Sequence, residues 1–452
     1  MPQYDLLIQD ATIVLPSGLE RGDIAVAEGK IQSRGTSLGG SAAQYIDAAG
    51  LHLFPGVIDP HVHCNEPGRT DWEGFASASR ALVAGGATLF FDMPLNSSPP
   101  TIDARAFGEK ARLGEAQSAA DFALWGGLVP HNLDRLEELH RCGAVGFKAF
   151  MSESGVEDFP CVDDDALYEG MKRIASLRSL IAVHAENNSI TAARRLRAIA
   201  RSHTSARDYL SSRPVMAELE AIQRALLLAA ESRCALHVVH VSTGRGVALI
   251  DEARRRGVDV SCETCPHYLF FTEEDLETLG GVAKCAPPLR SRQDREDLWS
   301  CLRSGTIDMM ASDHSPGLPE MKAGSNFFSI WGGVSGCQTM LPALLTEGAK
   351  NRGLPLQLVA GLTSRNAARR FGLLPSKGSL DPGADADLAL VNLNCSITLK
   401  AGDLLYRHQQ SPFVGQRFTA AVVRTMIRGK TICMDGKIVS EPRAKLIRPR
   451  TN

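Results

Sequence analysis

Two histidines, His61 and His63, stand one residue apart where the apolar run "LFPGVIDPHVH" ends. In an extended strand, side chains at positions i and i+2 point to the same face of the sheet. The two imidazoles therefore project together from the end of a buried strand, where they form a compact chelate. They could instead be polar residues that cap the strand, but further potential metal ligands lie at the ends of other apolar runs, and this favours a metal site.

Four further reactive side chains lie in or directly after apolar runs. Taken singly, a histidine in such a run could be a satisfied buried residue, and an aspartate could cap a helix. If the runs are strands of one barrel, their C-terminal ends meet, and side chains from different strands converge there. Histidine and carboxylate are the usual ligands of zinc and similar metals, and an aspartate among them can also take a proton. The four are Lys148 in "VGFKAFM", His184 in "LIAVHAE", His240 in "LHVVHVS" and Asp313 in "MMASDHSP".

Lys148 would bury an ammonium among apolar neighbours. An unpaired buried charge is costly, so a lysine in this position loses its proton or finds a partner. The side chain could also extend its charge to the mouth of the barrel. A neutral amine, however, can react with carbon dioxide to give a carbamate, whose two oxygens can bridge two metal ions. With four histidines and an aspartate at the same mouth, we expect Lys148 to be carboxylated in this way.

The middle of the chain alternates short apolar runs with helical segments such as "MAELEAIQRALLLAAES" and "GVALIDEARRRG". Eight such units over residues 56–375 predict an α/β fold with a (β/α)8 TIM barrel. A doubly wound open sheet is the alternative, but it does not need eight regular repeats. The runs are "GVIDPHVH", "GATLFFDMP", "FALWGGLV", "VGFKAFM", "LIAVHAE", "LHVVHVS", "VDVSCETCPH" and "IDMMASDHSP".

Both ends of the chain have a different texture from the middle. Residues 1–55 and 376–452 read as short strands separated by glycine-containing turns. We therefore expect these two segments to pair as one small β-sandwich domain.

The composition argues against several classes of partner. With 49 Lys and Arg against 51 Asp and Glu, the net charge of −2 gives no reason to expect nucleic acid or an anionic membrane. No secretion signal or membrane-spanning run is evident, so a cytoplasmic location is expected. The 11 cysteines should then be reduced thiols, and the "CETC" pair of Cys262 and Cys265 is read as packing thiols.

The order of these residues resembles the binuclear amidohydrolases. The H-x-H after the first strand, the lysine in the fourth, the histidines of the fifth and sixth and the aspartate of the eighth are similar to the cyclic amidohydrolases over the whole chain. That family includes hydantoinases, dihydropyrimidinases, dihydroorotases and allantoinases. The resemblance implies two divalent metal ions, zinc foremost, with iron, cobalt, nickel and manganese as alternatives. It assigns His61, His63, Lys148 and Asp313 to one metal, and Lys148, His184 and His240 to the other.

The substrate is indicated by residues beside these ligands. Dihydroorotases usually have an arginine two residues after the H-x-H, but this chain has Asn65, and Arg69 is read as solvated or structural. Hydantoinases usually have a tyrosine where Glu153 stands and a cysteine where Ser315 stands. The stretches "NEPGRTDWEG", "GFKAFMSESGVEDFP", "SDHSP", "PEMKAG" and "WGGVSG" resemble allantoinases.

Allantoinase resemblance implies a small neutral substrate, allantoin, whose hydantoin ring amide is opened to allantoate in purine degradation. A hydroxide bridging the metals would attack, with Asp313 as general base and then acid. Asn96 and Ser315 are the candidate substrate contacts, although Asn96 could equally be a turn former. His267 and His314 are expected to be structural. Relatives are commonly homotetramers.

Three other functions remain open on the sequence. A hydantoinase or dihydropyrimidinase is the first alternative, and a dihydroorotase-like enzyme is the second. Some proteins of this fold are non-catalytic and have lost metal ligands. All six ligand positions are present here, which argues against that class.

Overall fold

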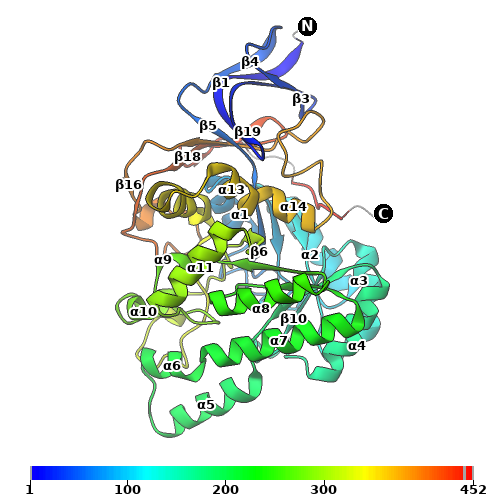
Figure 1. Cartoon of the computed structure of the whole chain (residues 1–452), viewed down its shortest axis with the longest axis vertical. Helices are drawn as coiled ribbons and strands as arrows, with labels where there is room; N and C mark the ends of the chain where they lie inside the picture. The colour runs from blue at the N-terminus through cyan, green and yellow to red at the C-terminus, as the bar shows by residue number, and fades with distance from the viewer. Residues whose placement is uncertain (1–2, 441–443, 450–452) are drawn as a thin grey trace.

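The computed structural model describes residues 3–440 and 444–449. A barrel of parallel strands and surrounding helices forms the body of the molecule, and a β-rich layer lies across one end of it (Figure 1). Helices α7, α8 and α11 cover one outer side of the barrel. This arrangement leaves the opposite end of the barrel for the loops that follow the strands.

The barrel strands coincide with the eight apolar runs of the sequence. Strands β6 to β8 form one parallel sheet, and β9 to β14 form another. Because β8 and β9 are two pieces of one extended segment, the two sheets together supply eight barrel strands, and a parallel bridge between Val62 and His314 joins the first strand to the segment after the last. The strands are β6 (Val57–Val62), β7 (Ala87–Asp92), β8 (Asp121–Leu124), β9 (Gly126–Gly127), β10 (Phe147–Phe150), β11 (Leu180–His184), β12 (Ala235–Val238), β13 (Val260–Thr264) and β14 (Met309–Met310).

Helices follow the strands, and local signals explain where several begin. Asp103 and Asp163 each accept a hydrogen bond from a main-chain N–H one turn into the helix, at 2.8 Å, which satisfies a donor that the first turn leaves free. The helices are α1 (Phe75–Ala84), α2 (Ala104–Gln117), α3 (Leu136–Cys142), α4 (Asp164–Ser176), α5 (Asn188–Ala200), α6 (Ala206–Ser212), α7 (Val215–Ser232), α8 (Gly244–Arg255), α9 (Pro266–Phe270), α10 (Glu273–Leu279), α11 (Arg292–Ser304), α12 (Met340–Ala343), α13 (Leu356–Ala360) and α14 (Asn366–Arg370).

Strands from both ends of the chain pair directly. β5 runs parallel to β1 and antiparallel to β15, so the two ends share a nine-stranded sheet with a buried apolar core of its own. The predicted fold class, a (β/α)8 barrel with a small β-sandwich built from both termini, is confirmed. The strands of this sheet are β1 (Tyr4–Leu15), β2 (Gly18–Ala27), β3 (Lys30–Gly35), β4 (Ala42–Asp47), β5 (His52–Pro55), β15 (Leu388–Asn392), β18 (Ala421–Ile427), β19 (Lys430–Met434) and β20 (Lys437–Ile438).

A small pair of strands, β16 (Ile397–Thr398) and β17 (Arg417–Phe418), lies outside this sheet. The exact boundaries that the sequence suggests, with breaks at residues 55/56 and 375/376, stay a prediction.

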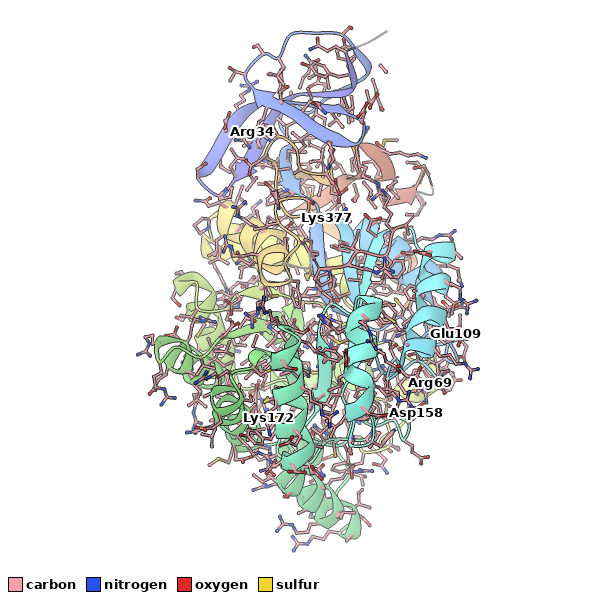
Figure 2. The ribbon with its side chains drawn as sticks, turned by 90° about the vertical axis from the view of Figure 1, so that its right-hand side faces the viewer. Arg34, Arg69, Glu109, Asp158, Lys172 and Lys377 are labelled. Atoms are coloured by element: carbon pink, nitrogen blue, oxygen red, sulfur yellow. The ribbon has the colours of Figure 1, made fainter. Side chains whose placement is uncertain are left out.

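One buried lysine joins the sheet to the barrel. The Nζ of Lys377 lies 2.8 Å from a carboxylate oxygen of Asp121, at the start of β8, and 2.6 Å from one of Asp387, just before β15. Asp385 lies at 3.1 Å from the same ammonium. Figure 2 places Lys377 at the junction of the two parts. Since the three carboxylates surround one ammonium, the cluster ties the orientation of the sheet to that of the barrel.

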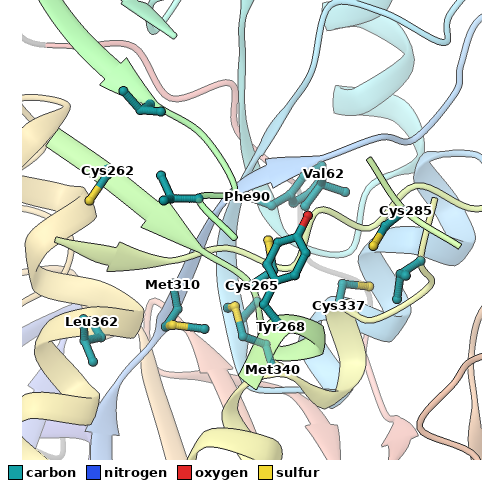
Figure 3. Packing of buried hydrophobic residues seen from close by; sticks show 14 of the residues in the cluster. Val62, Phe90, Cys262, Cys265, Tyr268, Cys285, Met310, Cys337, Met340 and Leu362 are labelled. Carbon is teal, nitrogen blue, oxygen red and sulfur yellow. The ribbon is translucent and has the colours of Figure 1, made fainter. Parts of the chain in front are cut away.

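The cysteines are free thiols, as expected. Cys262 and Cys265 are buried in one apolar cluster with Tyr268 and Met310, where burial raises the pKa of both thiols (Figure 3). Such thiols act as small apolar side chains. The "CETC" pair therefore packs the protein interior.

Candidate active site

His61, His63 and Asp313 form a compact cluster at the C-terminal end of the barrel strands. His61 lies in β6, His63 follows it, and Asp313 follows β14. A carboxylate oxygen of Asp313 lies 3.2 Å from Nε2 of His61 and 3.5 Å from Nε2 of His63. One ligand atom from each residue lies within 4.8 Å of the others, which is a spacing suited to one metal ion.

His184 and His240 form a second pair beside the first. His184 ends β11, and His240 follows β12. Their facing nitrogens, Nδ1 of His184 and Nε2 of His240, are 3.1 Å apart. The rings of His240 and His61 have centroids 5.5 Å apart, so the two groups of side chains share one cavity. The structure thus brings together the four histidines and the aspartate that the sequence singled out.

Lys148 lies in β10 with its side chain fully buried, 0% exposed. Its Nζ has no hydrogen-bond partner in the described part of the chain and lies 5.1 Å from the centroid of the Phe150 ring. Burial lowers the pKa of this amine to about 8, partly offset by Glu263 and Asp313. The alternative in which the lysine extends to solvent is therefore wrong, and the amine has the burial that favours an uncharged, nucleophilic form.

The turns after two of the strands have unusual backbone angles. His240 and Asp313 have φ values of 38° and 45°, in the left-handed region that non-glycine residues rarely adopt. Such strain persists where the surroundings over-determine it, and it is concentrated at functional sites. Here it turns the chain sharply at the strand end and directs both side chains toward the shared cavity.

A cavity of about 350 Å³ opens above the histidines. Asn96 and Ser315, the predicted substrate contacts, both line it, and Nδ2 of Asn96 lies 3.5 Å from Oγ of Ser315. Glu153 lies farther out on the same cavity wall and pairs with Arg195 at 2.7 Å. The cavity is thus lined by the neutral polar groups Asn96 and Ser315 and also by charged residues, of which Lys284 is buried and Glu153 is exposed.

Arg69 and His314 have structural contacts. Arg69 donates a hydrogen bond of 2.8 Å to the carbonyl oxygen of Asn96 and lies 3.4 Å from Asp158 (Figure 2). His314 is buried with one ring nitrogen 3.5 Å from Glu73 and the other accepting from the N–H of Gly336. Both agree with the structural roles that the sequence suggested.

Sequence reasoning missed the carboxylate that supports His61. An oxygen of Glu263, in β13, lies 2.6 Å from Nδ1 of His61, and its other oxygen lies 3.0 Å from Nε2 of His237. His237 contacts Ser261 at 2.8 Å, which completes a buried chain of hydrogen bonds across the barrel. Because Glu263 accepts the Nδ1 proton, Nε2 of His61 is left free to bind a metal. The only signal in the sequence is an acidic residue inside the apolar run "VDVSCETC".

A second missed carboxylate supports His184. Glu186 accepts a 2.9 Å hydrogen bond from Nε2 of His184 and contacts the guanidinium of Arg213. Although burial opposes it, Arg213 and His184 lower the pKa of Glu186 to about 2. The ring of Phe150 stacks on one face of the His184 ring, with centroids 4.6 Å apart and planes 9° apart. His184 is therefore held with Nδ1 facing His240.

Comparison with known proteins agrees with this geometry. The model of the amidohydrolase family matches residues 52–432. An allantoinase from Rubrobacter xylanophilus is 54% identical over 450 residues, covering 100% of this chain and 99% of that protein. One from Deinococcus radiodurans is 52% identical, covering 99% of each. The chain belongs to the amidohydrolase family.

Solved amidohydrolase structures share the whole architecture. An L-hydantoinase (dihydropyrimidinase) from Arthrobacter aurescens superimposes with a TM-score of 0.97 at 36% identity, covering 99% of this chain and 100% of that one. A D-hydantoinase superimposes with a TM-score of 0.91 at 29% identity, covering 99% of both chains. The barrel and the sheet built from both ends therefore match the architecture of these two hydantoinases.

The donor set fits the metal-dependent chemistry of this amidohydrolase. Burial lowers the pKa of His61, His184 and His240, which favours the neutral imidazoles that metal binding requires. Although burial acts in the other direction, His61 and His63 hold the pKa of Asp313 well below its usual range. The buried Nζ of Lys148 has no hydrogen-bond partner among the described residues. Ionised carboxylate, neutral imidazoles and an unpaired amine are the groups that a metal site needs.

Proposed function

We propose that this amidohydrolase is an allantoinase, which hydrolyses the hydantoin ring amide of allantoin to give allantoate. The observation that carries the proposal is the set of allantoinases that are 41–54% identical to it over at least 95% of its length. The convergence of histidines and Asp313 around one cavity supplies the chemistry that such a hydrolysis requires.

Six residues would hold two divalent metal ions, with zinc as the proposed metal. His61, His63 and Asp313 would bind one, and His184 and His240 would bind the other. Lys148, carboxylated by carbon dioxide, would help to hold both. When bound, the metals would polarise the amide carbonyl as Lewis acids and lower the pKa of the attacking water.

Asp313 carries the proton in this reaction. Its carboxylate is ionised and faces the cavity, so it can accept a proton from the water that attacks the ring carbonyl. As the C–N bond breaks, Asp313 returns that proton to the ring nitrogen, and the carbonyl carbon becomes the carboxylate of allantoate. Glu263 and Glu186 hold His61 and His184 in the tautomers that expose the correct nitrogens.

Asn96 and Ser315 are the proposed substrate contacts. Both are buried, neutral and able to donate and accept hydrogen bonds, which suits a small uncharged ring rich in N–H and C=O groups. Asn65 donates to the carbonyl oxygen of Pro316 at 3.3 Å and brings no positive charge to bind a carboxylate. This disfavours the dihydroorotase-like alternative.

Hydantoinase activity is the second candidate, because the Arthrobacter L-hydantoinase structure superimposes so closely. A panel of allantoin, hydantoin, dihydrouracil and dihydroorotate on metal-loaded protein separates the two. We expect the highest kcat/KM with allantoin. Preference for hydantoin or dihydrouracil would reject allantoin as the substrate but would not contradict the assignment of the site residues. If none of the four rings is opened, the proposed hydrolase activity is wrong.

No described helix has the length and apolar character needed to cross a membrane.

We also propose that the protein is a cytoplasmic homotetramer. Sedimentation of the purified protein tests the assembly, with a four-subunit mass expected and a monomer as the contrary result.

A further inference from the structure

Two buried lysines contact the same short segment of the cavity wall, residues 330–333. Lys284 donates from Nζ to the carbonyl oxygen of Ile330. Lys322 donates to the carbonyl oxygens of Trp331, at 3.0 Å, and Gly333. All four residues of the segment line the cavity. Its main-chain carbonyls therefore accept hydrogen bonds from two buried lysine amines, of which Lys284 lines the cavity and Lys322 does not.

Lys284 and Lys322 have no carboxylate to neutralise among the described residues. Both are buried, and within the described chain neither forms an ion pair with a carboxylate. Burial lowers the pKa of both amines to about 7. A buried amine is costly unless it makes good hydrogen bonds, and apolar side chains would fill the same space at less cost. Contact with one wall segment is what these two side chains share.

The inner side of the segment rests on the loop that carries Asp313. The indole N–H of Trp331 donates to the carbonyl oxygen of Ser315 at 3.3 Å, and the main-chain N–H of Ser315 donates to Val334 at 2.9 Å. Gly333 has no room for a side chain, because an added Cβ would overlap the main chain and Cβ of Ser315. The wall is thus packed between the lysines and Ser315.

We propose that Lys284 and Lys322 are positioning residues that hold the wall segment 330–333 against the Asp313–Ser315 loop and so set the width of the substrate cavity. Lys322 acts only through the wall, since it does not line the cavity. The identity of the substrate rests on the proposed function, whereas the anchoring of the wall does not.

Lys322→Met tests the proposal, with Lys322→Arg as the conservative variant and Lys172→Met as the matched control. Lys172 is a half-exposed lysine of α4, far along the chain from the wall. In Lys322→Met we expect hydrogen exchange in peptide 328–336 to accelerate about tenfold, and KM for allantoin to rise about tenfold with little change in kcat. Lys322→Arg should restore part of both effects, and metal content should not change.

Gly333→Ala should also separate the wall segment from the Asp313–Ser315 loop. It pushes the wall away from Ser315 without altering either lysine, so the same rise in exchange and KM is expected. Unchanged exchange in peptide 328–336, or faster exchange with unchanged KM, would overturn the proposal. If the native protein opens a different ring, KM is measured on that ring. If it opens none of the rings, the proposed function is wrong, and the hydrogen-exchange rates alone test whether Lys322 holds the wall segment.

Discussion

Asp313 is the residue whose loss should slow the reaction even when the metal content is matched. Asp313→Asn keeps the shape of the side chain but removes the base that takes and returns the proton. Since a positioned acid or base contributes about 10²–10⁴-fold to rate, kcat should fall by about that factor. The measurement is steady-state turnover at equal metal content. Turnover equal to that of the native enzyme would contradict the assigned role.

Glu263 should matter for metal affinity. In Glu263→Gln the buried carboxylate that accepts the His61 Nδ1 proton becomes a neutral amide. Loss of such a supporting partner typically weakens metal binding by about 10–100-fold. Competition with a chelator measures this directly. Glu252→Gln, on the exposed face of α8, is the control and should bind metal as the native protein does. Equal affinity in the two variants would show that Glu263 does not support His61.

Lys322 should make stability depend on pH in a defined direction. Its pKa is about 7 in the folded protein and ordinary in the unfolded chain, so between these values the unfolded state binds the extra proton. The free energy of unfolding therefore rises with pH above about 7, by up to about 1.4 kcal/mol per unit. Urea unfolding of native protein and Lys322→Met at pH 7 and 9 isolates this contribution. A constant difference between the two proteins would contradict the shifted pKa.

The reactive residues of the site could be read from the sequence because each interrupts an apolar strand. His61, His184 and Asp313 were recognisable in this way, and their order matched a family pattern. Glu263 and His237 were not, because each needs a partner on another strand to acquire a role, and strand contacts across a barrel leave no local signal. The anchoring of the wall by Lys322 depends on loop packing, which no periodicity encodes.

Helix α2 offers a comparison between two glycines of one element. An added Cβ at Gly114 would lie 2.5 Å from the ring of Phe122 in β8, whereas Gly108 has open space around it. Gly114→Ala should lower the free energy of unfolding by about 1–3 kcal/mol through overpacking. Gly108→Ala should raise it by about 0.5–1 kcal/mol, because alanine favours the helix. Thermal unfolding measures both, and equal effects would show that α2 does not pack on β8 through Gly114.

The elements themselves were predictable to different degrees. All eight barrel strands fall on apolar runs, since strands buried on both faces have continuous hydrophobic sequences. The order of strands in the terminal sheet could not be predicted, because β5 and β15 pair across more than three hundred residues. Alternation in each strand shows which face is buried but not which strand lies beside it.

The molecule as a whole depends on the Lys377 cluster between sheet and barrel. Lys377→Met removes the ammonium that pairs with the buried carboxylate of Asp387, whereas Asp121 keeps its ion pair with Arg428. Breaking a buried ion pair in this way costs about 3–5 kcal/mol. Chemical unfolding should show a loss of that size. Lys30→Met is the control, because Lys30 is half exposed and pairs with Asp385 at 3.1 Å, and surface pairs contribute about 1 kcal/mol or less. If both variants lose a similar free energy of unfolding, the Lys377 cluster does not stabilise the contact between sheet and barrel more than a surface ion pair does.

The bridge between Val62 and His314 also has a consequence for synthesis. The first and last barrel strands supply the ligands of the same cluster, so a chain leaving the ribosome exposes His61 and His63 long before Asp313 exists. At about 5–20 residues per second, that interval lasts tens of seconds. During it the nascent chain has paired imidazoles but no complete cavity. The metal-binding cluster can therefore form only after the chain has grown by the 250 residues that separate Asp313 from His63 (313 − 63).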